Sequence, residues 1–125
     1  MMKPFQKLAF YVVTVTLCFS CHFNKGKFVI TNKSDFNIDS LTINPDSRKQ
    51  IIKLDKGEHI EHSIVMNEAK TDGSYFITFK NSDNNTIVSK SFGYYTNGYQ
   101  IEDEINITVL NDTILIESTF NKPYK

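Results

Sequence analysis

At 125 residues the chain has room for one folded domain, because single domains commonly contain roughly 100–150 residues. It carries 14 basic and 14 acidic residues, and this balance argues against the concentrated positive charge that a nucleic-acid partner requires. Hydrophobic residues make up 40% of the chain, which is enough for a packed core and unlike a disordered tail.

The N-terminal segment has the features of a secretory signal sequence. Residues 1–7 contain Lys3 and Lys7 and no acidic residue, and an apolar run of twelve residues follows from Leu8 to Phe19. A membrane-spanning helix needs about 20 apolar residues, so this run is too short for a permanent anchor. The sequence therefore predicts a cleaved leader over residues 1–20.

The end of this run is Leu17-Cys18-Phe19-Ser20-Cys21, which resembles the lipobox of bacterial lipoproteins. In that family a small residue precedes an obligatory cysteine. Ser20 matches the small position, whereas Cys18 stands where Leu is usual and Phe19 is bulkier than usual. The resemblance implies cleavage before Cys21 and lipid attachment to that cysteine. Cys18 is a second candidate for modification, and an ordinary secretory signal or an uncleaved N-terminal helix is the alternative.

Lipidation of Cys21 explains the cysteine content. Cleavage removes Cys18 and leaves one cysteine, whose sulfur the thioether bond to diacylglycerol protects from oxidation and disulfide formation. Each buried CH₂ contributes about 0.8 kcal/mol, so two or three acyl chains hold a protein on a bilayer. Residues 21–26 form a short tether, of which the five residues after the cysteine span less than about 20 Å. No acidic residue flanks the cysteine, which favours the periplasm-facing side of the outer membrane.

From Lys27 onward, apolar and polar residues alternate with a period of two, which is typical of β-strands. Clusters of Asn, Asp, Ser and Gly separate these segments, as turns do. Strands are expected at residues 27–31, 37–43, 50–54, 59–66, 74–80, 86–92, 104–110 and 113–119. The pattern predicts one all-β domain over residues 27–120 and a tail at residues 121–125. The domain would be a small antiparallel β-sandwich of seven or eight strands, similar to immunoglobulin-like or transthyretin-like sandwiches.

The alternation also predicts which side chains face the core. These are Ile60, Ile64, Met66, Tyr75, Ile77, Phe79, Ile105, Ile107, Val109, Ile114 and Ile116. Between Ile38 and Leu41 the alternation changes register, which predicts a β-bulge or burial on both faces of the strand.

Three histidines, His22, His59 and His62, are the candidate metal ligands. His59 and His62 are three residues apart and point to opposite faces of a strand, so they cannot bind one ion unless a bulge intervenes. We expect His62 to be a hydrogen-bonded histidine at the core or at a sheet edge. The acidic run Glu102-Asp103-Glu104 could contribute calcium ligands but lacks the spacing of a known loop and is more typical of a solvated turn.

Catalytic patterns are missing from the sequence. There is no Gly-x-Ser-x-Gly nucleophile motif, and no thiol is left after lipidation. We therefore predict no enzymatic activity, no metal and no cofactor.

The segment from Phe92 to Gln100 holds three of the six tyrosines and two of the five glycines. Tyr94, Tyr95 and Tyr99 are the candidate binding residues, because tyrosine combined with Gly and Asn is typical of recognition loops, and aromatic faces stack on sugar rings. The alternative is structural: Asn97-Gly98 is a favourable hairpin turn, and a tyrosine beside it can cover the end of the core.

The sequence thus predicts a lipid-anchored, non-catalytic binding module of the bacterial cell envelope. Its partners would be the membrane, through the lipid on Cys21, and a protein that contacts a sheet edge or the tyrosine-rich segment. A carbohydrate- or peptidoglycan-binding lipoprotein is one alternative, and a periplasmic inhibitor or immunity lipoprotein is another.

Overall fold

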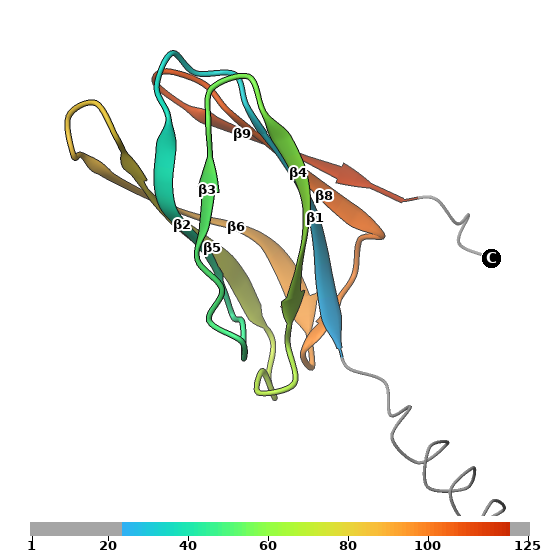
Figure 1. Cartoon of the computed structure of the whole chain (residues 1–125). Coiled ribbons are helices and arrows are strands. Elements are labelled where there is room, and N and C mark those ends of the chain that lie inside the picture. The colour runs from blue at the N-terminus through green and yellow to red at the C-terminus, as the bar shows by residue number, and fades with distance from the viewer. Residues whose placement is uncertain (1–23, 121–125) are drawn as a thin grey trace, which may run out of the picture.

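The computed structural model describes residues 24–120, in which nine strands pack as two face-to-face sheets (Figure 1). The predicted all-β sandwich is confirmed. Within these residues there is no helix with the length and apolarity that a membrane span requires. The predicted leader at residues 1–20, Cys21 and the tail at residues 121–125 lie outside the described residues.

The two sheets differ in size. Sheet A consists of four strands in the order β4 (His59–Val65), β1 (Lys25–Asn32), β8 (Glu104–Val109) and β9 (Ile114–Thr119). Sheet B consists of five strands in the order β3 (Ile52–Leu54), β2 (Ile38–Asn44), β5 (Gly73–Asn81), β6 (Ile87–Thr96) and β7 (Tyr99–Gln100). Eight strands coincide with predicted ones, whereas the two-residue β7 was not predicted. All pairs are antiparallel except β1 with β8, which is parallel.

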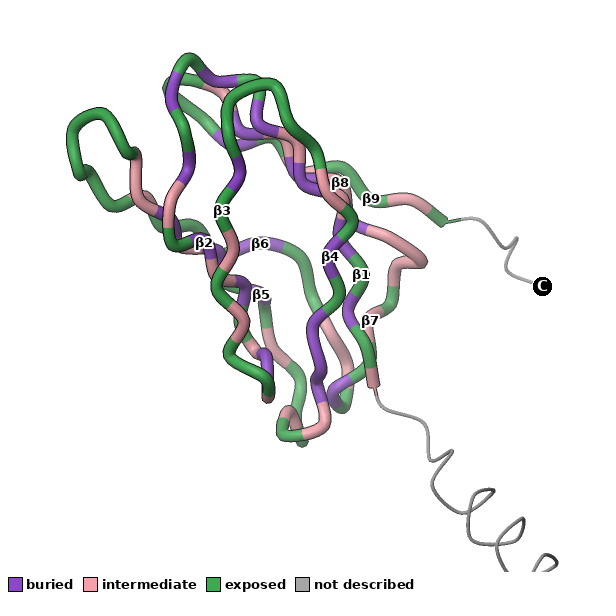
Figure 2. Tube along the Cα trace, in the orientation of Figure 1, coloured by how far each residue is buried: buried purple, intermediate pink, exposed green. Residues whose placement is uncertain are grey.

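The inner faces of the two sheets form the core, and buried residues alternate with exposed ones along most strands (Figure 2). Nine of the eleven predicted core residues are buried, and Ile60 and Ile116 are partly buried against the same cluster. The period-two pattern therefore identified the correct face of each strand to which it was applied.

Two irregularities bend the strands of sheet B. The register of β2 shifts between Ile38 and Leu41, with Ser40 at a φ of 51°, so the predicted slip is a β-bulge. A second shift lies between β5 and β6, where Gly93 has a φ of 63°. A glycine suits this position because a Cβ at residue 93 would lie 3.0 Å from the Tyr75 ring. Past this bulge β6 curves toward the start of β1 (Figure 1).

The β3–β4 side of the sandwich is covered by the loop between β2 and β3. The Ser47 N–H donates to the Val65 carbonyl at 2.8 Å, and Asp46 Oδ1 accepts the Val65 N–H at 3.2 Å. Gln50 Nε2 donates to the Ser63 carbonyl at 2.9 Å. These bonds occupy backbone groups on the outer edge of β4, so that part of the edge is not free to pair with another strand.

Asn32 connects the two layers at the end of the domain opposite the start of β1. Its side chain is fully buried, and its Nδ2 donates to the carbonyls of Phe36 at 2.9 Å and Leu54 at 3.1 Å. Its Oδ1 accepts the Ser34 N–H at 3.0 Å. One amide thus satisfies buried backbone groups of the β1–β2 loop and of β3.

Replacing Asn32 with Ala should lower the free energy of unfolding by roughly 2–3 kcal/mol, because buried polar backbone groups would lose their partners. Urea denaturation measures this difference. Asn111→Ala is the matched control: this exposed side chain bonds Asp35, so the expected loss is within about 1 kcal/mol. Equal losses in the two variants would contradict the role given to Asn32.

Candidate functional site

The tyrosine-rich segment forms a hairpin made of the end of β6 and the short β7. Tyr95 pairs with Gln100 and Thr96 pairs with Tyr99. The turn residues Asn97 and Gly98 have φ values of 52° and 78°, as a two-residue type I′ turn requires. The predicted Asn-Gly hairpin turn is confirmed.

Asp72, in the loop between β4 and β5, fixes the conformation of this hairpin. Its Oδ2 accepts the Tyr94 hydroxyl at 2.9 Å, and its Oδ1 accepts the Asn97 N–H at 2.9 Å. The hydrogen bond to this carboxylate raises the pKa of Tyr94. The turn also packs closely on the same loop, since a Cβ at Gly98 would collide with the Ala69 carbonyl oxygen. The hairpin is therefore held by contacts with the β4–β5 loop as well as by the pairing of its own strands.

The three candidate tyrosines do not share one surface. Tyr94 and Tyr99 are 46% and 61% exposed. They lie on the same face of the hairpin, because Tyr94 and Thr96 are two residues apart in β6 and Tyr99 lies directly opposite Thr96. Tyr95 lies on the opposite face, with its ring centroid 5.3 Å from that of Tyr75. Two of the tyrosines are thus available for recognition, and Tyr95 covers the end of the core.

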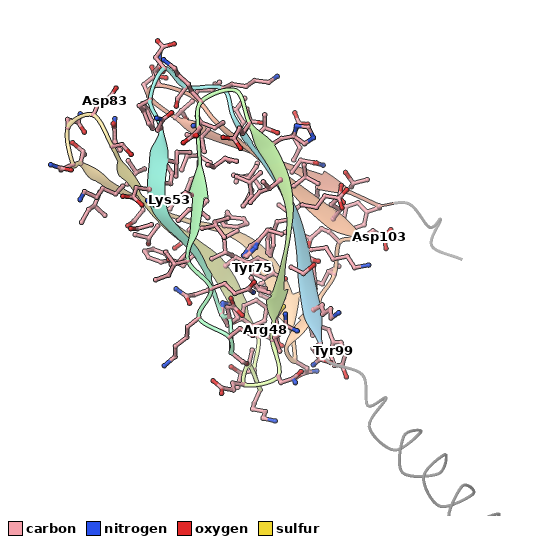
Figure 3. All side chains as sticks on the ribbon, in the orientation of Figure 1. Arg48, Lys53, Tyr75, Asp83, Tyr99 and Asp103 are labelled. Atoms are coloured by element: carbon pink, nitrogen blue, oxygen red, sulfur yellow. The ribbon has the colours of Figure 1, made fainter. Side chains whose placement is uncertain are left out.

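An aromatic cluster supports the hairpin from inside the sandwich. The Tyr75 ring is fully buried, 5.2 Å from the Phe28 centroid and 5.6 Å from the Phe92 centroid (Figure 3). Burial raises the pKa of Tyr75, and the charges of Glu102 and Tyr95 add to this shift. The cluster contains residues of β1, β5 and β6, so it joins both sheets beneath the exposed tyrosines.

The histidines and the acidic run do not assemble into a metal centre in the described part of the chain. His59 is exposed and His62 is buried on the other face of β4, as strand alternation predicts, while His22 lies outside the described residues. Glu102, Asp103 and Glu104 are only partly exposed. No group of three His, Cys, Asp or Glu side chains within residues 24–120 is placed to hold an ion.

His62 differs from expectation in its hydrogen bonding. It is 7% exposed, and its Nε2 is buried without a partner in residues 24–120. Burial lowers the pKa of His62, and the Asp46 charge opposes this shift only in part. Burial by itself would raise the pKa of Asp46, but hydrogen bonds from Gln50, Val65 and Arg48 lower it. The folded domain therefore favours a neutral imidazole beside a charged carboxylate.

The free energy of unfolding should fall as the pH drops through about 6.5, the ordinary pKa of histidine. In this range His62 becomes protonated in the unfolded chain but stays neutral in the folded domain, where its pKa is lower. The free energy of unfolding, measured by urea denaturation between pH 7 and pH 5, should decrease with decreasing pH. His62→Gln should flatten this dependence, and His59→Gln, a change of an exposed residue in the same strand, should leave it unaltered. An unchanged slope in His62→Gln would show that another group is responsible.

The β6–β9 side of the sandwich is open, in contrast to the β3–β4 side. β9 is the last strand of sheet A, and residues 87–92 of β6 have no partner strand beyond β5, because β7 pairs only with Tyr95 and Thr96. The two edges are joined by Lys90, whose Nζ donates to the Ile114 carbonyl at 3.1 Å. The Leu110 N–H donates to the Thr113 carbonyl at 2.9 Å, so these two residues form a hydrogen-bonded pair of the β8–β9 ladder. Hydrogen-bonded pairs alternate with non-bonded pairs in an antiparallel ladder, so the backbone groups of Ile116 and Ser118 point away from β8.

Exposed apolar side chains and an apolar cavity lie along this open edge. Ile87, at the start of β6, and Leu115, in β9, are exposed. A cavity of about 130 Å³ lies at one end of the edge, lined by Phe79, Val88 and Ile114 among others. The sequence identified the strands that contribute these residues, but edge positions depend on strand order, which periodicity does not contain.

No family model matches the chain, and no curated protein or solved structure shows significant similarity to it.

Proposed function

We propose that this protein is a lipid-anchored, non-catalytic interaction module of the bacterial cell envelope, and that a protein partner adds a β-strand to the free edge of β9. The single observation that carries the second part is the difference between the two sides of the sandwich. Hydrogen bonds with Asp46, Ser47 and Gln50 cover part of the edge of β4, whereas the edge of β9 carries only the bond from Lys90 among the described residues.

Strand addition is the binding mode for which such an edge is suited. The backbone groups of Ile116 and Ser118 supply main-chain hydrogen bonds, which give affinity without requiring a particular partner sequence. Exposed Leu115 and the cavity beside Val88 supply apolar contacts, which give selectivity for the side chains of the added strand. The partner that fits is an extended protein segment with alternating apolar side chains.

The proposed anchor is the lipid on Cys21, after cleavage of residues 1–20. Its support is the lysine-containing start, the short apolar run and the Ser20-Cys21 pair in the sequence. The proposed location is the periplasm-facing surface of the outer membrane. An anchored partner-binding domain requires no catalytic group.

A glycan-binding function is the second candidate, because Tyr94 and Tyr99 are exposed on one face beside the Asp72 carboxylate. Aromatic faces and carboxylates are the groups that contact sugar rings and their hydroxyls. Retention on a peptidoglycan matrix that is lost in a Tyr94→Ser, Tyr99→Ser double variant would support this function over strand addition.

Replacing Ser118 with Pro removes one outward-facing N–H of β9 without removing a bond to β8. Partner capture should become roughly tenfold weaker, the equivalent of about 1.4 kcal/mol for a lost main-chain hydrogen bond. The measurement is affinity purification of the tagged protein from its native membranes after mild cross-linking, with quantitative mass spectrometry of the bound protein.

Ser118→Ala is the matched control, because it changes the same side chain and keeps the N–H. It should retain full capture. Equal capture by the Pro and Ala variants would contradict strand addition at β9, and the absence of any specific protein under several detergents would contradict the protein-binding function itself.

A further inference from the structure

Exposed apolar side chains gather at the end of the domain where β1 begins. β1, β3, β5 and β8 start at this end, which we call the tether end because the described part of the chain begins there with β1 (Figure 1). Of the eight exposed large hydrophobic residues in the described part of the chain, three fall within residues 94–101. We call these three side chains the hairpin face: Tyr94, Tyr99 and Ile101.

The hairpin is bonded directly to the first residues of β1. Gln100 Oε1 accepts the Lys27 N–H at 2.7 Å, and Gln100 Nε2 donates to the Lys27 carbonyl at 3.2 Å. The pairing of β1 with β8 starts at Phe28. At Lys27, one residue earlier, the Gln100 side-chain amide makes the backbone hydrogen bonds that a neighbouring strand would make. Tyr99 accordingly lies close to the start of β1, and Asp83 lies at the opposite end of the domain (Figure 3).

Covalent geometry limits how far this face can lie from the proposed lipid. Three peptide units separate Cys21 from Asn24, the first described residue, and three Cα–Cα steps span at most about 11 Å. Gln100 bonds Lys27, only three residues further along the chain. A lipid on Cys21 therefore holds the tether end, with the hairpin face, near the bilayer surface.

The chemistry of the hairpin face suits the water–lipid boundary. Tyrosine carries an apolar ring and a polar hydroxyl, and tyrosines are enriched at the headgroup level of membranes. Lys25, the exposed first residue of β1, provides a positive charge at the tether end that anionic headgroups attract. The bonds of Asp72 to Tyr94 and Asn97 already order the hairpin, so little conformational freedom is lost when the face enters the boundary.

We propose that the hairpin face lies in the headgroup layer of the bilayer that carries the lipid of Cys21, so that the domain has a fixed orientation on its membrane. This inference rests on the lipid anchor of the proposed function. It assigns Tyr94 and Tyr99 to a lipid surface and leaves the edge of β9 accessible to the partner.

The chain contains no tryptophan, so a single introduced tryptophan is an unambiguous fluorescent probe. Tyr99→Trp places it on the hairpin face, and Leu115→Trp places it on an exposed position near the start of β9, at the opposite end of the domain. The full lipidated chain of each variant is reconstituted in vesicles of phosphatidylethanolamine and phosphatidylglycerol, with and without brominated acyl chains. Tyr99→Trp should lose roughly half of its fluorescence with brominated lipid, because aromatic rings at headgroup level contact the upper acyl chains, and Leu115→Trp should lose none.

Flotation of the vesicles separates failure of the anchor from failure of the orientation. Protein that floats with the vesicles while its Tyr99→Trp probe is unquenched keeps the anchor and overturns the orientation. A Tyr99→Trp probe shielded from both brominated lipid and aqueous iodide would show a protein surface covering the hairpin face, which also overturns the proposal. Protein that does not float overturns both the anchor and the inference.

Discussion

β1 is hydrogen-bonded along both of its edges, and the positions of the other elements follow from this arrangement. It pairs with β4 over residues 25–31 and with β8 over residues 28–32. The part of its second edge that β8 does not reach is occupied by the Gln100 amide. The strand that follows the N-terminal segment is therefore a central strand of its sheet, so a load applied through the proposed tether acts on the interior of the fold.

The parallel pairing of β1 with β8 determines where the tyrosine-rich hairpin lies. Because both strands start at the tether end, the chain must return to that end before β8 begins. β6 makes this return, and the bulge at Gly93 turns it from sheet B toward β1. The exposed Tyr94 and Tyr99 are thus brought to the tether end by topology, while Tyr95 completes the aromatic cluster around Tyr75. This arrangement separates the tether end, which we propose faces the membrane, from the open sheet edge of β9.

The sequence predicted the features that depend on neighbouring residues. Alternation is local, so it identified eight strands, the core face and the bulge between Ile38 and Leu41. The Asn97-Gly98 turn was predicted for the same reason, since its chemistry lies within two residues. The sequence did not predict the parallel pair, the two-residue β7 or the hydrogen bonds of Asp72 and Gln100. These depend on contacts between residues far apart in the chain, which one sequence does not encode as a visible pattern.

The candidate site was also predicted only in those features that depend on local sequence. Tyr94 and Tyr99 are exposed, as a recognition role requires. That Tyr95 rather than Tyr94 faces the core follows from the bulge in β6, and the open edge of β9 follows from strand order. His62 was expected at the core or at a sheet edge and is buried in the edge strand β4, but its unpartnered Nε2 differs from the hydrogen-bonded histidine that was expected.

The proposed anchor, the orientation of the domain and the access of a partner all depend on the covalent state of the N-terminus. Intact-mass and N-terminal peptide mass spectrometry of the protein extracted from its native membranes tests this directly. The account predicts a mature chain that begins at Cys21 and carries diacylglycerol on its sulfur. A chain that retains residues 1–20, or one that begins at or near residue 21 without acyl groups, would contradict it.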